Sequence, residues 1–462
     1  MFMKKIMMGL ILALSAGSET QAQSPAVFKS GDRVVFAGNS ITEAGFYESN
    51  IWLYYMTHFP DQRITVFNAG IGGDVAGQIN NRFEEDVLAK KPSVVVLTFG
   101  MNDSGYFEFN AADADETAKQ RLEKSFQSFG LLQKKLLAHP EVQPVIMSSS
   151  PYDETMKNKD NYFKGKSKLM EQIATFQQTA AKTNGWAFVD LLRPMTEINI
   201  REQKAKPEYT LTGPDRIHPG RAGHLVMSAF FLENQGLAGK PVARILINAK
   251  AGTAEAENAK VNLHKKASAA VAFDYLANAL PFPIDSVNAQ WDNPQKQSDA
   301  LAVYPFIKNF NQETLQVKNL KKGDYQLMID GTKISTFSAD SLSKGINMAL
   351  LSNTPQYQQS LSVMYLNDLR AELEKKLRDY YWLQFNFFKG ENLLYSDSQQ
   401  ALDKVLVKAR TDVFVRSKMG TYQTARFPEV REMWERNIQQ LSDRIYQINK
   451  PTSHLIEIVA VK

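Results

Sequence analysis

Residues 34–42 read Val-Val-Phe-Ala-Gly-Asn-Ser-Ile-Thr, a short apolar run that ends in a turn. The apolar part lacks polar alternation, which is typical of a strand buried on both faces. Gly38, Asn39 and Ser40 follow it, and these three residue types commonly form turns. The stretch therefore predicts a buried strand with a serine directly beyond its carboxyl end.

Similar apolar runs recur as far as residue 238, separated by segments with helical periodicity. Buried strands joined by helices predict a doubly wound, flavodoxin-like α/β fold with a parallel sheet covered on both faces. Such sheets carry their sites at the carboxyl ends of the strands. The further strand runs are Ile64–Phe67, Val94–Leu97, Val145–Met147 and Ala187–Val189, and the helical segments are Val75–Lys90, Ala118–Ala138, Lys166–Lys182 and Gly220–Leu232.

The pattern changes after residue 238. Alternating strand-like runs, with Asp330-Gly331 as a hairpin signal between two of them, predict a small antiparallel β-domain over residues 239–340. Residues 341–462 are helical in pattern, and their strand-like end, Leu455–Val459, could return to the β-domain. A stripe of four apolar residues predicts one buried helix face there, formed by Trp434, Ile438, Leu441 and Ile445.

Composition excludes several classes of protein. The chain has 462 residues, enough for two or three domains, and a net charge of +5 without any block rich in Lys or Arg. This charge pattern argues against a nucleic-acid partner. The chain has no cysteine, so disulfides, thiolate metal sites and a cysteine nucleophile are excluded.

The first residues have the pattern of an export signal. Lys4 and Lys5 precede an apolar run over residues 6–16, which is too short to span a bilayer as a helix. Thr20-Gln21-Ala22 places small residues at the outer positions of a cleavage site. We therefore expect a signal peptide over residues 1–22, export to the periplasm or beyond, and no stable membrane insertion after cleavage. An uncleaved membrane anchor is the alternative.

Four polar segments follow strands or lie near the end of the α/β region. They are Gly38–Thr42, Asn68–Gly73, Gly100–Asp103 and Asp215–Pro219. Taken singly, each is an ordinary turn, and Asp-x-x-His could equally be half of a metal site. Together they would meet at one edge of the sheet, where Asp215 could orient the imidazole of His218 and Asn102 could donate its amide N–H. His224 falls inside the next helix and is interpreted as structural or supporting.

In this order the four segments resemble the blocks of the SGNH (GDSL-like) hydrolase superfamily, whose members carry Ser, Gly, Asn and His. The likeness covers about residues 30–237, which gives a hydrolase domain over residues 23–238. Gly345–Leu351 resembles a segment of long bacterial members with a C-terminal extension. One departure is Asn39, which stands where the family usually has Asp.

The resemblance implies a serine esterase that needs no metal and no cofactor. Ser40 would be the nucleophile, His218 the base and Asp215 its partner. The oxyanion hole would consist of the backbone N–H groups of Ser40 and Gly70 and the amide of Asn102. Because Asn39 supports a turn, we expect activity to survive the departure.

For substrate, the resemblance and the export pattern favour an O-acyl ester, above all an O-acetyl group on a carbohydrate. Aromatic loops at residues 105–107 and 151–152 could pack on sugar rings or could anchor the loops themselves. A lipid or aryl esterase and a non-catalytic glycan-binding protein are the alternatives. The oligomeric state is open, and the C-terminal helices could serve as an oligomerisation arm.

Overall fold

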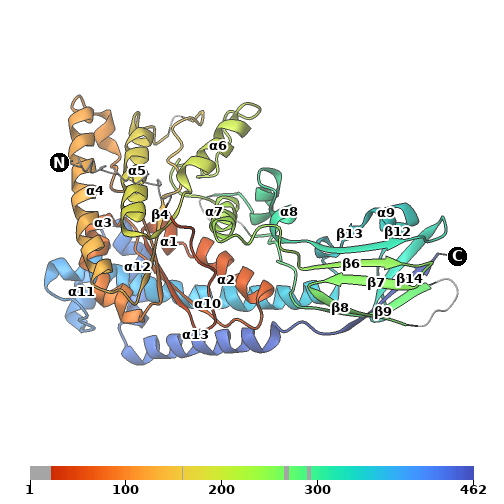
Figure 1. Cartoon of the computed structure of the whole chain (residues 1–462). Helices are drawn as coiled ribbons and strands as arrows, with labels where there is room; N and C mark the ends of the chain where they lie inside the picture. Colours follow the sequence, from red (N-terminus) through yellow and green to blue (C-terminus); the bar gives the residue numbers. More distant parts are fainter. Residues whose placement is uncertain (1–21, 159, 265–269, 289–292, 462) are drawn as a thin grey trace, which may run out of the picture.

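The computed structural model describes residues 22–158, 160–264, 270–288 and 293–461. A parallel sheet with its helices lies at one end of the molecule and two further sheets lie at the other (Figure 1). Two long helices, α10 (Pro355–Asn386) and α13 (Pro428–Ile448), run along one side. The expected signal falls on residues 1–22, of which only Ala22 is described. Within the described ranges, no helix has the length and apolar character needed to cross a membrane.

The first sheet has the order β2-β1-β3-β4-β5, and all of its strands are parallel. This confirms the predicted doubly wound α/β fold. Each predicted apolar run is a strand, and alternate side chains enter two cores: Val34 and Phe36 face one, Val35 and Ala37 the other. The strands are β1 (Arg33–Gly38), β2 (Thr65–Gly70), β3 (Val94–Phe99), β4 (Gln143–Ser148) and β5 (Ala187–Val189).

Helices cover both faces of this sheet, because each helix buries its apolar side in one of the two cores. One face carries α2 (Tyr47–His58), α6 (Leu192–Gln203) and α7 (Arg221–Asn234), and the other carries α3 (Ala76–Asn81), α4 (Ala114–Leu137) and α5 (Lys166–Asn184). The short helix α1 (Ser40–Glu43) follows β1, and a 3-10 turn, η3, covers Phe107–Asn110.

The expected helix over residues 75–90 is broken. Helix α3 ends at Asn81 and gives way to a π turn, η1 (Phe83–Val87), and a 3-10 turn, η2 (Leu88–Lys90). At the break, the guanidinium of Arg82 is buried and bonds Asp74 at 2.7 Å and Asp86 at 2.6 Å. Such π turns often occur at functional sites, and α3 alone separates this one from the loop after β2.

The second region consists of two sheets that pack their apolar faces together. One has the order β13-β10-β6-β7 and the other the order β12-β11-β14-β9-β8. The strands are β6 (Ala243–Asn248), β7 (Thr253–Glu257), β8 (Ala259–Leu263), β9 (Ala270–Ala277), β10 (Glu313–Lys318), β11 (Asp324–Ile329), β12 (Thr332–Ser338), β13 (Ile346–Asn347) and β14 (His454–Ala460).

One expectation about this region is wrong and two are confirmed. The pair β6 and β10 is parallel, so the region is not purely antiparallel. Its two strands are separated by a long crossover, which allows parallel pairing. The hairpin at Asp330-Gly331 joins β11 to β12, and both residues have positive φ angles, 48° and 76°. The C-terminal strand does return, because β14 pairs with β9 and β11.

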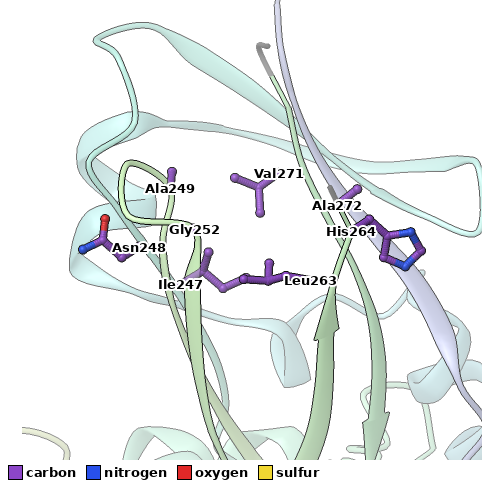
Figure 2. A pocket seen from close by; sticks show the side chains of 8 residues that line it. All are labelled: Ile247, Asn248, Ala249, Gly252, Leu263, His264, Val271 and Ala272. Atoms are coloured by element: carbon purple, nitrogen blue, oxygen red, sulfur yellow. The ribbon is translucent and has the colours of Figure 1, made fainter. Parts of the chain in front are cut away.

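A pocket opens between the turn that joins β6 to β7 and the strands β8 and β9 (Figure 2). Aliphatic side chains form most of its lining, including Ile247, Leu263 and Val271. His264 also lines it, and its Nε2 lies 3.0 Å from Asp274 Oδ1. This pocket lies in the β region, away from the four polar segments of the sequence.

The C-terminal helices pack on the α/β region. Helix α10 begins with the hydroxyl of Thr354 as its cap and Pro355 in its first turn, and it lies against α2, α12 and α13. In the predicted stripe on α13, Ile445 is fully buried and Trp434 partly buried. The remaining helices and turns are α8 (Phe306–Phe310), α9 (Ala339–Lys344), α11 (Gln399–Lys408), α12 (Val413–Ala425), η4 (Gln297–Ala302), η5 (Met348–Leu350) and η6 (Phe388–Glu391).

Candidate active site

The serine predicted as nucleophile lies at the start of α1, directly after the central strand β1. Asn39 caps this short helix, because its side-chain Oδ1 accepts the backbone N–H of Ile41 at 3.0 Å. An Asn oxygen can therefore serve as the cap of this turn. Ser40 is half-buried, and its own N–H has no hydrogen-bond partner among the described residues.

Ser40, His218 and Asp215 form a continuous chain of hydrogen bonds. Ser40 Oγ lies 2.9 Å from His218 Nε2, and His218 Nδ1 lies 2.5 Å from Asp215 Oδ2. The other oxygen of Asp215 accepts the backbone N–H groups of Ile217 and His218, both at 2.9 Å. The carboxylate thus holds both the imidazole and the turn that carries it.

The turn itself depends on a residue that sequence reasoning missed. Arg216 lies between Asp215 and His218 with φ of 68°, and its side chain is fully buried. Its guanidinium donates to the carbonyl oxygens of Asp153 at 2.8 Å and Asp160 at 2.9 Å. A positive φ is unusual for a residue with a side chain, so these bonds help to stabilise the turn.

The electrostatics of the Asp215 side chain favour its charged form. Partial burial acts to raise the pKa of Asp215, but hydrogen bonds from His218 and the nearby imidazole outweigh burial and lower that pKa. The carboxylate is therefore ionised at neutral pH. A charged partner at Nδ1 keeps the proton there and leaves Nε2 facing Ser40 as an acceptor.

Asn102 is held in a fixed orientation at the end of β3. Its Nδ2 donates to the backbone carbonyl of Asp74 at 2.9 Å, and its Oδ1 accepts the hydroxyl of Tyr106 at 2.5 Å. No other partner of Nδ2 is found among the described residues, which leaves its second proton available. The buried Lys166 stabilises the same loop by donating to the carbonyls of Met101 and Gly105, each at 2.6 Å.

The structure does not support Gly70 as a donor to an oxyanion. Gly70 is the last residue of β2, and its N–H already donates to Asn68 Oδ1 at 2.8 Å. A side chain at this position would lie 2.2 Å from the backbone nitrogen of Glu43, so Gly70 is packed beneath α1. Position 70 requires glycine because the backbone of α1 packs closely against it, and not because its N–H is free.

Gly73 has the properties that were expected of Gly70. It is exposed, its φ is +89°, and its N–H has no partner among the residues that the structure describes. It precedes Asp74, whose carbonyl receives the Asn102 amide. Gly73, whose N–H is unpaired within the described part of the chain, is therefore the chain neighbour of the residue that binds the Asn102 amide. The pair Gly72-Gly73 in the sequence was the available signal for this position.

Comparison with known proteins gives the family. The sequence model described as the GDSL-like lipase/acylhydrolase family matches residues 36–226, and a second, the diltiazem deacetylase C-terminal helical domain, matches residues 361–450. The structure resembles BT4096, a gut microbial diltiazem-metabolizing enzyme, with 42% identity and a TM-score of 0.92. That likeness covers 95% of this chain and all of that one.

The chain belongs to the GDSL-like (SGNH) family. It is a carboxylic ester hydrolase. A curated relative, an acetylxylan esterase from Geobacillus stearothermophilus, is 25% identical over 224 residues. That match covers 45% of this chain and 95% of the relative. That match covers less than half of this chain, whereas the likeness to BT4096 covers nearly all of it.

A pocket of about 320 Å³ adjoins the imidazole of this GDSL-like esterase. Five of its six lining residues have polar side chains, and the set consists of Asp160, Asn161, Pro214, Asp215, His218 and Asn293. Asn293 comes from the crossover after β9, outside the segment matched by the family model. This side chain is buried, and its Nδ2 has no partner among the described residues. The crossover thus contributes directly to the pocket.

Two other residues considered in the sequence, His224 and Tyr152, have structural roles. His224 is buried in α7, where its ring stacks on Tyr47 with a centroid distance of 6.0 Å. Burial lowers the pKa of His224 to about 3, so it is neutral. Tyr152 is also buried, and its hydroxyl donates to the carbonyl of Asn161 at 2.6 Å. Tyr152 therefore anchors a loop, whereas Phe107 is 74% exposed.

Proposed function

We propose that this esterase removes O-acetyl groups from alcohols by two-step acyl transfer, with Ser40 as nucleophile. The observation that carries the proposal is the hydrogen-bonded chain from Ser40 Oγ through His218 to Asp215. This arrangement lets the imidazole take a proton from the hydroxyl while the carboxylate stabilises the resulting imidazolium. The nucleophile is half-buried at the sheet edge, next to a polar pocket.

In the first step, Ser40 Oγ attacks the ester carbonyl carbon and His218 Nε2 accepts the hydroxyl proton. The carbonyl oxygen becomes an oxyanion, which receives hydrogen bonds from the N–H groups of Ser40 and Gly73 and from Asn102 Nδ2. His218 then protonates the leaving alcohol as the C–O bond breaks. Water attacks the acyl-enzyme in the same way, so the products are one acid and one alcohol.

For the acyl group, acetyl is supported by one relative and by one family model. One is named an acetylxylan esterase, and the C-terminal helices match a domain named for a diltiazem deacetylase. For the alcohol, we propose a carbohydrate hydroxyl, because the pocket beside His218 offers Asp160, Asn161 and Asn293 as hydrogen-bonding groups. Export through a signal over residues 1–22 to the periplasm or the cell exterior would bring the enzyme to acetylated glycans.

A second candidate is a small acetylated molecule that is not a carbohydrate. It is favoured by the 42% identity with a diltiazem-metabolizing enzyme over nearly the whole chain. The two candidates share the same chemistry at the acyl carbon and differ only in the alcohol that leaves. They are therefore separated by comparing kcat/KM for different alcohols, since that ratio measures discrimination between substrates.

The test is acetate release from acetylated xylooligosaccharides, diltiazem and 4-nitrophenyl acetate, by wild type and Ser40→Ala in parallel. We expect release by the wild type alone, with the highest kcat/KM for the acetylated sugar. A higher value for diltiazem would favour the second candidate, and faster cleavage of 4-nitrophenyl octanoate than of the acetate would favour a lipid esterase. Glycan binding without any hydrolysis would indicate a non-catalytic protein and overturn the proposal.

A further inference from the structure

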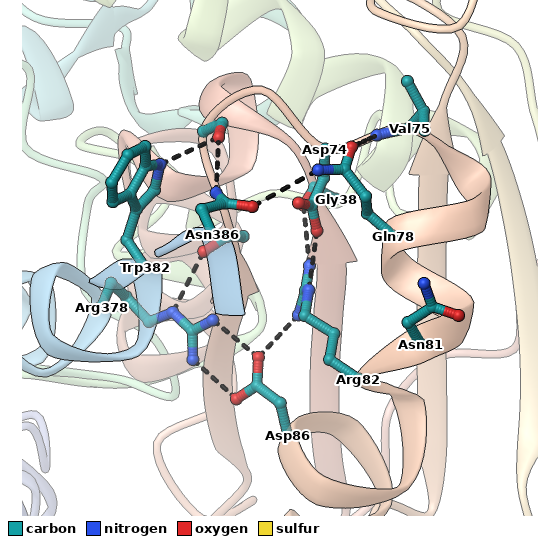
Figure 3. A network of polar contacts seen from close by, with 12 residues as sticks. Gly38, Asp74, Val75, Gln78, Asn81, Arg82, Asp86, Arg378, Trp382 and Asn386 are labelled. Carbon is teal, nitrogen blue, oxygen red and sulfur yellow. Dashed lines mark hydrogen bonds and ion pairs between the residues drawn. The ribbon is translucent and has the colours of Figure 1, made fainter. Parts of the chain in front are cut away.

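The long C-terminal helix α10 reaches the active-site loop that follows β2 (Figure 3). Trp382 Nε1 donates to the carbonyl oxygen of Gly72 at 2.9 Å, and Asn386 Nδ2 donates to the same oxygen at 3.3 Å. The two donors are four residues apart, so they lie on one face of the helix. A single carbonyl of the loop therefore receives two hydrogen bonds from a distant part of the chain.

This carbonyl belongs to the same peptide group as the N–H of Gly73. A trans peptide group is planar, and its C=O and N–H point in opposite directions. When α10 holds the carbonyl of Gly72, the N–H of Gly73 must point away from α10. Two consecutive glycines restrict the backbone less than any other pair, so the peptide plane has little intrinsic preference of its own.

We infer that Trp382 and Asn386 are positioning residues for the oxyanion hole. They fix the orientation of the Gly72–Gly73 peptide group and so direct the Gly73 N–H toward the oxyanion. The inference rests on the proposed function, in which Gly73 is an oxyanion donor. Accepting two hydrogen bonds also polarises the carbonyl, which strengthens the N–H of the same peptide group as a donor.

A buried ionic cluster holds the two ends of the same loop (Figure 3). Arg378 Nε donates to the carbonyl of Gly70 at 3.0 Å, and its two other nitrogens bind Asp86, each at 2.7 Å. Arg82 links Asp86 to Asp74 and also donates to the carbonyl of Gly38 at 3.1 Å. The loop is thus attached to α10 at its start and to Arg82, directly after α3, at its end, with the Gly72 carbonyl between.

The C-terminal helices are also linked to α1, the short helix that begins with Ser40. Lys418 of α12 binds Glu43 of α1 at 3.0 Å and Asp379 of α10 at 2.7 Å. Gly72 lies against both Glu43 of α1 and Trp382 of α10, because a side chain there would meet Glu43 Oε2 at 2.5 Å and Trp382 Nε1 at 3.5 Å. Glycine at position 72 therefore allows α1, the loop and α10 to approach one another.

The test is steady-state hydrolysis of 4-nitrophenyl acetate by Trp382→Phe, Asn386→Leu and the double variant. We expect kcat to fall about 5- to 30-fold in the double variant with KM within about twofold, because a misdirected donor affects the transition state more than the ground state. The single variants should lose less, and the pH dependence of kcat/KM should keep its shape because His218 does not move.

Tyr422→Phe is the matched control. It removes a hydroxyl that donates to the carbonyl of Ser396 at 2.8 Å, from a buried aromatic residue in the same helical region. This bond has no contact with the loop after β2. We expect a comparable loss of melting temperature in the control and no change in kcat. A fall in kcat that follows the melting temperature in all variants would overturn the inference.

The rate at which a 4-nitrophenyl phosphonate labels Ser40 gives a second measurement. The adduct is tetrahedral and places an oxygen in the oxyanion position, so labelling should slow in parallel with kcat even where folding is only partly retained. Unchanged kcat and unchanged labelling in an active, folded Trp382→Phe/Asn386→Leu protein would refute the positioning role alone. A wild type that neither hydrolyses the ester nor is labelled would remove the proposed function and this inference together.

Discussion

The two sides of the candidate active site are constructed in different ways. On the acid–base side, Ser40, His218 and Asp215 bond to one another directly, and all three come from the α/β region. On the oxyanion side, the peptide group of Gly73 is held by Trp382 and Asn386, far along the chain. The first side is therefore complete within the hydrolase fold, whereas one donor of the second, the Gly73 N–H, is held by the added helices.

The largest expected effect tests the acid–base side. Ser40→Ala should reduce kcat by a factor on the order of 10⁴ or more, and His218→Ala should be nearly as severe. Asp215→Asn should leave more residual activity, because it alters the orientation of the imidazole without removing the base. Measured kcat values for acetate release check the order. If Ser40→Ala were as active as the wild type, Ser40 would not be the nucleophile and the acid–base side would be assigned wrongly.

On the oxyanion side, Asn102→Ala should lower kcat about a hundredfold, the usual effect of removing one donor. KM should change little, because the donor acts mainly on the tetrahedral species. Tyr106→Phe serves as a graded control, since it removes the hydroxyl that orients the Asn102 amide and leaves the amide itself. We expect a smaller loss for Tyr106→Phe, and an equal or larger loss would contradict the assignment of the donor.

The connection between the two regions should appear in stability. Arg378→Met leaves the buried Asp86 with only Arg82 and Lys90 as cationic partners. We expect the free energy of unfolding to fall by about 2–4 kcal/mol. Arg436→Met, which breaks an exposed pair with Glu432 on α13, should cost less than about 1 kcal/mol. Denaturant unfolding compares the two. Equal losses would mean that the cluster in Figure 3 does not link the regions.

The smallest expected effect concerns Glu48, a buried residue of α2 that accepts a hydrogen bond from Asn68 Nδ2 at 2.5 Å. Burial raises the pKa of Glu48 to about 8. The folded protein therefore keeps a proton that the unfolded chain releases above about pH 4.5, so Glu48 lowers stability progressively as pH rises toward 8.

Glu48→Gln should remove this dependence. The free energy of unfolding of the variant, relative to wild type, should increase between pH 5 and pH 8 by a few kcal/mol at most, as linkage predicts. Unfolding of both proteins at pH 5, 6.5 and 8 measures the difference. A constant difference across this range would mean that Glu48 is already ionised in the fold.

Sequence reasoning reached the parallel sheet and the position of Ser40 for a physical reason, whereas Asp215 and His218 follow no strand and were located by their spacing and by the family resemblance. Strand burial leaves an uninterrupted apolar run, and polar residues directly after such a run must lie at one edge of the sheet. Gly73 could not be distinguished from Gly70 in this way. The choice depends on which N–H is already occupied, and the bond from Gly70 to Asn68 Oδ1 exists only in the folded turn.

Other features were missed because they are not local. The parallel pairing of β6 with β10 follows a crossover whose path no periodicity encodes. In α10, Arg378, Trp382 and Asn386 fit an ordinary helical pattern, and nothing in that pattern reveals that they face Gly70 and Gly72. The pocket residue Asn293 was likewise missed, because it lies in the crossover after β9 and in none of the four polar segments.

The position of β14 has a consequence for how the protein is made. This strand lies in the middle of its sheet, between β9 and β11, so those two strands have no direct pairing with each other. During synthesis, β9 and β11 emerge from the ribosome before the helices from α10 to α13, and β14 follows them all. Until residue 460 is made, the half-built sheet exposes two strand edges, which are sites of aggregation. The α/β region can complete its sheet much earlier, which makes the β region the later and more vulnerable step of folding.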